Sequence, residues 1–218
     1  LLAVSGLTTR FPVTGGLLRR VVANVHAAED VSFTINKGQT LSLVGESGCG
    51  KSTVGRSLLR LVEPLSGQIT LDGVEIMDMN PSELREARRD MQMIFQDPFA
   101  SLNPQMQLME QVAEPMRNFG TASGQELTDR IEMLFDRVEL PRSFLRRFPH
   151  ELSGGQRQRV AIARALALNP KLIVADEAVS ALDVSVQAQV VNLMMELQAE
   201  LGLSYLFISH DMAVVERV

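Results

Sequence analysis

Cysteine is nearly absent from this chain, and long hydrophobic runs are missing. Both absences limit the class of protein to which the chain can belong. The 218 residues include a single cysteine, Cys49, so no disulfide can form within the chain, and a reducing compartment suits it. Hydrophobic residues make up 45%, yet no apolar run approaches the roughly 18 residues of a membrane-spanning helix. We therefore expect a protein that is soluble or attached to a membrane through a partner.

An excess of basic residues is missing as well. Lys and Arg number 21 against 26 Asp and Glu, which gives a formal net charge of −5. Because binding to a phosphate backbone normally leaves a basic footprint, this balance argues against nucleic acid as an obligatory partner, although it leaves room for a local basic patch. No internal repeat or secretory signal is visible, and the missing initiating Met leads us to expect a piece of a longer chain.

The clearest motif that is present is GESGCGKST, residues 45–53. It follows an apolar, strand-like run at 41–44 and precedes an amphipathic helical pattern, which is the context that the phosphate-loop pattern G-x-x-x-x-G-K-[ST] requires. Glycines let consecutive N–H groups point inward at phosphate oxygens. We expect Lys51 to reach the β and γ phosphates and the Ser52 hydroxyl to bind Mg²⁺. The predicted nucleotide-binding residues here are Gly45, Glu46, Ser47, Gly48, Cys49, Gly50, Lys51, Ser52 and Thr53.

Strand and helix patterns alternate along the rest of the chain, which predicts a mainly parallel sheet. Strands are expected at 2–8, 25–35, 91–95, 171–175 and 204–208, and amphipathic helices at 126–140 and 186–201. Pro12 is expected to end the first strand, so residues 13–24 are interpreted as an exposed loop. From 98 to 149 the pattern is helical, and we predict a separate lobe inserted between strands of the core.

Two carboxylates follow the apolar strand pattern at 171–175. The carboxyl ends of neighbouring parallel strands face the same crevice, so Asp176 and Glu177 are expected beside the phosphate loop. Asp176 is suited to hold Mg²⁺, directly or through water, and Glu177 to accept a proton from an attacking water. A lone Asp-Glu pair would more simply be a solvated turn, and its combination with the phosphate loop favours the catalytic interpretation.

A second glycine turn, Leu-Ser-Gly-Gly-Gln at 152–156, opens another helical pattern. Ser153 and the two glycines at a helix start could bind an anion. The pattern alone is equally compatible with an ordinary capped turn.

Taken together these motifs resemble the ATP-binding-cassette (ABC) ATPases, and the resemblance covers essentially the whole chain. They stand in that family's order: the phosphate loop, a glutamine loop at Gln96, the signature at 152–156, the acidic pair, a Ser-Ala-Leu-Asp loop ending at Asp183, and a switch histidine at His210. In isolation Gln96 would be a polar strand cap and His210 a hydrogen-bonding residue at a helix entry. Their order and neighbours favour functional roles.

The resemblance implies a head-to-tail dimer in which Ser153 and Gly155 of one cassette close on the γ-phosphate held by another, while Gln96 and His210 sense that phosphate. Gln96 would also bind the metal ion, together with Ser52 and Asp176. Phe11 stands where the family places an aromatic side chain against adenine, but a strand-end phenylalanine could equally be core. The nucleotide-contacting set implied beyond the phosphate loop is Phe11, Gln96, Ser153, Gly154, Gly155, Gln156, Asp183 and His210.

The fold implied is an α/β phosphate-loop NTPase with a mainly parallel core sheet, an N-terminal antiparallel β subdomain and an inserted helical subdomain. Residues 1–218 would form a single cassette domain, truncated at its C-terminal end. The core with its β subdomain would comprise 1–97 and 150–218, and the helical subdomain 98–149.

Longer stretches are similar to the bacterial peptide and nickel importer ATPases. Ala178 and Val179 stand where many cassettes have Pro and Thr, a variation typical of glutathione importers. The resemblance implies an ATP- and Mg²⁺-dependent motor at the cytoplasmic face of the inner membrane, with a second cassette, two membrane-spanning permease subunits and, indirectly, a periplasmic binding protein. Glutathione, short peptides, opines and nickel all remain candidates for the transported solute. The rival hypotheses are a non-transport cassette acting on nucleic acid or ribosomes, and a small-molecule kinase.

Overall fold

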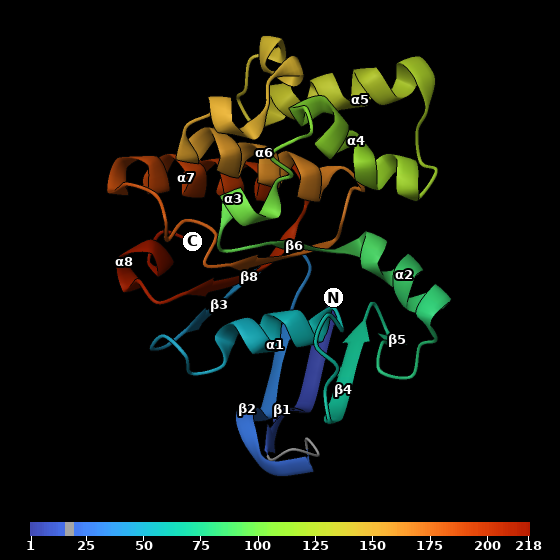
Figure 1. The fold of residues 1–218 in the computed structure, drawn as a ribbon, viewed down its shortest axis with the longest axis vertical. Coiled ribbons are helices and arrows are strands. Elements are labelled where there is room, and N and C mark those ends of the chain that lie inside the picture. The colour runs from blue at the N-terminus through green and yellow to red at the C-terminus, as the bar shows by residue number, and fades with distance from the viewer. Residues whose placement is uncertain (16–19) are drawn as a thin grey trace.

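Two sheets with a helix between them form the lower half of the molecule, and a group of helices covers the second sheet (Figure 1). The computed structural model describes residues 1–15 and 20–218. The first sheet is antiparallel with strand order β2-β1-β4-β5. Its strands are β1 (Leu2–Gly15), β2 (Arg20–Ile35), β4 (Ser66–Leu71) and β5 (Val74–Glu75).

The second sheet has the order β3-β8-β7-β6, and every pair in it is parallel. Its strands are β3 (Thr40–Val44), β6 (Met91–Ile94), β7 (Leu172–Asp176) and β8 (Ser204–Ser209). The prediction of an α/β fold with a mainly parallel core sheet and an N-terminal antiparallel part is confirmed. Because the strands are parallel, β3, β7 and β8 end at the same edge.

The predicted loop at 13–24 is wrong for the residues that the structure describes. Strand β1 continues past Pro12 to Gly15, and Phe11, Pro12 and Val13 pair with Val25, Asn24 and Ala23 of β2. Beyond Thr8, β1 has lost its other partner β4, so Pro12 lies in an edge segment with a neighbouring strand on one side only, where proline is tolerated. The part of the predicted loop at 16–19 lies outside the described residues.

Helix α1 (Lys51–Leu58) lies between the two sheets (Figure 1). Helices α6 (Gly154–Leu166) and α7 (Val184–Leu201) lie on the other side of the parallel sheet, and α4 and α5 lie beyond them (Figure 1). The segment between β6 and β7 contains α3 (Pro98–Ser101), α4 (Leu108–Asn118), α5 (Gly124–Arg137) and two short 3-10 helices, Arg142–Arg146 and Pro149–Glu151. The remaining helices are α2 (Pro81–Asp90) and α8 (Met212–Val215).

Strand β7 separates two hydrophobic cores. Ile173 and Ala175 belong to the core under the helices, whereas Leu172 and Val174 belong to the core that contains α1. This alternation is what the two-residue period of a strand produces when both faces are covered. Asp176 is the last residue of β7 and Glu177 follows it; Asp176 lies beside the start of α1, where Ser52 contacts it.

Over residues 1–15 and 20–218, no helix combines the length and the apolar character needed to cross a membrane.

Candidate functional site

The phosphate loop joins the end of β3 to the start of α1. Gly50 precedes the helix with φ of +97°, a backbone conformation that a residue with a side chain adopts only under strain. A Cβ built there would lie 1.8 Å from the carbonyl oxygen of Ala27 in β2. The close approach of β2 and the left-handed conformation together require glycine at this position.

Lys51 is folded back over its own loop. Its Nζ donates hydrogen bonds of 2.7 Å to the carbonyl oxygens of Gly45 and Glu46 and lies 3.8 Å from Cys49 Sγ. The lysine is buried, whereas Cys49 is exposed. The ammonium group therefore lies inside the turn, with the loop wrapped around it.

Asp176 meets the first turn of α1. The Ser52 hydroxyl donates a 2.6 Å hydrogen bond to Asp176 Oδ1, and Arg56 Nη2 lies 3.6 Å from Oδ2. The carboxylate is fully buried, and its Oδ2 accepts no hydrogen bond. Burial raises the pKa of Asp176, while the Ser52 hydrogen bond and Arg56 oppose that rise.

These groups fit a divalent cation. Magnesium is usually held by one or two protein carboxylates or hydroxyls together with substrate phosphates, and Asp176 Oδ2 is a buried oxygen with an unused lone pair. In the described part of the chain, no group of three or more His, Cys, Asp and Glu side chains could hold a metal ion. A cation here would therefore depend on Ser52, Asp176 and the nucleotide phosphates.

Glu177 contacts both predicted sensor residues, Gln96 and His210. Gln96 Nε2 donates to Glu177 Oε2 at 2.8 Å, and His210 Nδ1 lies 3.3 Å from the same oxygen. The Glu177 side chain is largely buried, its φ is +46° and its N–H is bonded to the Ile208 carbonyl. In this arrangement the Gln96 amide is engaged with Glu177, so its predicted contact with a metal ion stays a prediction.

The signature turn lies at the start of α6. Ser153 and Gln156 form a reciprocal cap, in which Gln156 N donates to Ser153 Oγ at 3.3 Å and Ser153 N to Gln156 Oε1 at 3.0 Å. Ser153 is exposed, Gly154 and Gln156 are half-buried and Gly155 is buried. Asp183 is exposed at the start of α7, where its side chain makes no capping hydrogen bond.

The predicted site residues thus fall into two groups. The phosphate loop, Asp176, Glu177, Gln96 and His210 are gathered around the carboxyl ends of the parallel strands. The signature turn and Asp183 form the second group. No hydrogen bond or ion pair among the residues described here joins the signature turn to the phosphate loop, as expected if each cassette carries two separate half-sites.

Phe11 belongs to neither hydrophobic core. It is 40% exposed and pairs with Val25, which is 53% exposed. Thr9, two residues earlier in β1, is buried, and its hydroxyl lies 2.9 Å from Ser57 Oγ on α1. The contact of Phe11 with adenine stays a prediction.

Sequence reasoning missed two contributors, Arg56 and Ala27. Arg56 is four residues after Ser52, so helical spacing alone would have placed both on one face of α1. The carbonyl of Ala27 could not have been found, because nothing in the sequence indicates which strand covers Gly50.

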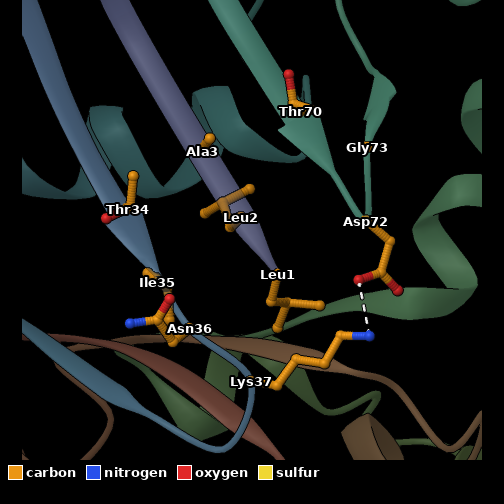
Figure 2. Close-up of a pocket in the computed structure, with 10 residues that line it drawn as sticks. All are labelled: Leu1, Leu2, Ala3, Thr34, Ile35, Asn36, Lys37, Thr70, Asp72 and Gly73. Atoms are coloured by element: carbon orange, nitrogen blue, oxygen red, sulfur yellow. Dashed lines mark ion pairs between the residues drawn. The ribbon is translucent and has the colours of Figure 1, made fainter.

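A cavity of about 660 Å³ lies away from this site. Figure 2 shows this cavity where β1 begins and where β2 and β4 end, beside the ion pair of 3.4 Å between Lys37 and Asp72. It contains none of the predicted nucleotide residues. Another cavity, of about 440 Å³, is lined by Gln96 and Arg56 and therefore adjoins the candidate site.

A strand, a glycine loop that wraps a lysine, and an acidic strand end bonded to the following serine define a phosphate-loop nucleotide-binding fold. Residues 28–180 match the family model described as ABC transporter. The chain belongs to the ABC transporter family, as the order of its motifs predicted.

Relatives and solved structures agree with this assignment. The chain is 59% identical over 218 residues to the glutathione import ATP-binding protein GsiA of Pectobacterium atrosepticum, covering 100% of this chain and 35% of that one. The chain therefore spans about a third of the length of that curated relative. It is 31% identical to a dimeric structure of MJ0796, a bacterial ABC transporter cassette, with a TM-score of 0.86 over 100% of this chain and 91% of that one.

A second structure of that cassette is a dimeric post-hydrolysis state bound to ADP and Pi. It has 32% identity and a TM-score of 0.86, and the match covers 100% of this chain and 91% of that one. The importer hypothesis is supported by these comparisons, and the nucleic-acid and kinase hypotheses are not.

Proposed function

We propose that the chain is an ATP-binding and ATP-hydrolysing cassette of an ABC importer. The observation that carries the proposal is the 2.6 Å bond between Ser52 and Asp176. It joins residues 124 positions apart in the sequence beside the phosphate-loop lysine, and the next residue after Asp176 is the carboxylate needed to activate water. The ADP- and Pi-bound state of the MJ0796 cassette supports the same activity.

Each side chain has a role that its position supports. Lys51 and the loop N–H groups bind the β and γ phosphates. Ser52 and Asp176 would hold Mg²⁺, which neutralises charge on the phosphates when bound. Glu177 takes a proton from the attacking water. Because Gln96 and His210 share one oxygen of Glu177, its other oxygen, Oε1, is left for that water.

The second cassette is proposed from the two separate half-sites. Ser153 is exposed, and the N–H groups at the start of α6 are directed out of the helix, where the helix dipole favours an anion. A nucleotide held by the phosphate loop of one cassette would be closed by this turn of another. Tighter binding of ATP than ADP to the closed pair would make hydrolysis reopen it.

The importer role and the solute rest on relatives. The protein from Pectobacterium atrosepticum is named for glutathione import, so glutathione is the first solute to test, with short peptides next. We propose two membrane-spanning permease subunits and a periplasmic binding protein as partners, at the cytoplasmic face of the inner membrane. The helices at 98–149 would form the helical subdomain that contacts the permeases.

Mg²⁺-dependent ATP binding and phosphate release by the purified chain test the proposal. Lys51→Ala should weaken ATP binding at least about tenfold, because it removes the buried cation from the phosphate site. Lys37→Ala is the matched control, since Lys37 is 76% exposed and pairs only with Asp72 among the described residues. Equal ATP affinity in the two variants would overturn the assignment of the site.

A separate experiment addresses the importer. The complete protein, produced with its permeases and binding protein, should support ATP-dependent glutathione uptake into membrane vesicles. Uptake of a short peptide but not of glutathione would reassign the solute. ATP hydrolysis stimulated by nucleic acid, with no transport of any solute, would reject the importer.

A further inference from the structure

The two glycines of the signature turn lie against the segment of the same chain that carries Asp183. A Cβ built on Gly155 would come within 2.5 Å of Val186 Cγ1, and one on Gly154 within 3.2 Å of Leu182 Cδ2. Neither glycine has a positive φ. The backbone of the turn therefore admits any residue, and what restricts position 155 is the space that Val186 occupies.

Val186 has little freedom to give way. It is in the first turn of α7, where a β-branched side chain has one strongly preferred rotamer. It packs against the core under the helices, as does Leu182. Helix α7 is itself anchored in that core by buried side chains further along, including Val190 and Val191. A side chain at 155 would therefore force the first turns of α6 and α7 apart.

The segment from Leu182 to Val186 is held to α7 as one unit. Gln187 Nε2 donates to the Leu182 carbonyl at 3.0 Å, and Gln187 N donates to the Asp183 carbonyl at 2.8 Å. Asp183 lies between the two side chains that meet the glycines, and it is exposed. The signature turn and Asp183 are thus two parts of one surface.

We propose that Val186, assisted by Leu182, is a positioning residue for the signature turn. It fixes the first turn of α6 and so sets where the N–H groups of Gly154 and Gly155 point, which the reciprocal cap of Ser153 and Gln156 leaves unused. It is Val186 of the same chain, and not the nucleotide of a second cassette, that requires glycine at position 155. The inference rests on the proposed function in one respect, namely that the turn acts by closing on a nucleotide held by another cassette.

The steric part is tested by a double-mutant cycle on the full chain without nucleotide. Gly155→Ala should lower the Tm by about 2–10 °C, because it overpacks the contact. Gly155→Ala with Val186→Ala should have nearly the Tm of Val186→Ala alone, since the new methyl group then has room. Val184→Ala is the control, because Val184 is 77% exposed on the same helix. Additive Tm shifts would overturn the proposal.

The positioning part is tested in a Glu177→Gln background, in which ATP-dependent dimers should accumulate. Gly155→Ala should leave fluorescent ATP-analogue binding to the single cassette within about twofold and weaken dimerisation at least about tenfold. Adding Val186→Ala should restore dimerisation to within about threefold of the parent. Recovery of the Tm without recovery of dimerisation would show that the nucleotide requires the glycine, and would overturn the proposal.

If the proposed function itself is wrong, the experiments give a different result. In that case the parent chain would bind ATP and still not dimerise at any concentration tested. The Tm cycle would then decide alone whether Val186 restricts Gly155.

Discussion

Replacing Glu177 by glutamine separates nucleotide binding from hydrolysis. The substitution keeps the shape of the side chain and an oxygen that can accept the 2.8 Å hydrogen bond from Gln96, but the amide cannot take a proton. Loss of a general base costs about 10²–10⁴ in rate, which corresponds to about 2.7–5.4 kcal/mol of barrier. The negative charge of Glu177 also raises the pKa of Asp176, so its removal favours the ionised form of that residue, which is the form that would hold Mg²⁺.

We therefore expect Glu177→Gln to bind Mg-ATP at least as tightly as the parent chain and to release phosphate at least about 100-fold more slowly in single-turnover experiments. The control is Glu200→Gln, because Glu200 is 55% exposed and forms a surface ion pair with Arg137, and exposed pairs contribute little. Single-turnover phosphate release within about threefold of the parent would remove Glu177 as the base. Loss of ATP binding would show instead that the residue holds the site together.

Two further substitutions test the geometry of the phosphate loop. Gly50→Ala should lower the Tm by at least about 4 °C and abolish ATP binding, because it combines a left-handed φ with a 1.8 Å approach to Ala27 O; unchanged ATP binding would contradict the close packing of β2 on the loop. Asp176→Asn should raise the Tm by about 2–4 °C at neutral pH while weakening Mg²⁺ binding, because a buried carboxylate is replaced by a neutral isostere. Burial raises the pKa of Asp176, so ionisation costs stability as the pH rises through that pKa, and the Tm gain should vanish at acid pH; a gain that persists there would refute this cause.

The fold and the gathering of the site could be predicted because both depend on local patterns combined with one topological rule. Parallel strands end at one edge, so the acids at the end of β7 had to lie near the loop after β3 even though β8 runs between these strands. The contact between Ser52 and Asp176 follows from that rule. Motif order was sufficient for the family, because six short motifs in sequence are more specific than any one of them.

What could not be predicted are the features that depend on which element covers which residue. Pro12 ends a strand that has partners on both sides, but it is tolerated where β1 has only β2 beside it, and the sequence does not show where β4 stops. Periodicity likewise says that α7 is amphipathic without saying that Val186 faces the signature turn. The sharing of Glu177 by Gln96 and His210 depends on side-chain directions at three separate strand ends.

The two glycine turns illustrate why a motif and its physical cause must be argued separately. At Gly50 the backbone itself is left-handed and β2 closes over it, so glycine is required before any nucleotide binds. At Gly155 the backbone is unrestricted, and a side chain of α7 supplies the constraint. In both turns the requirement for glycine arises from contacts within the chain itself. In the proposed function the N–H groups of the first turn would bind a phosphate held by this chain, and those of the second turn a phosphate that another cassette would have to hold.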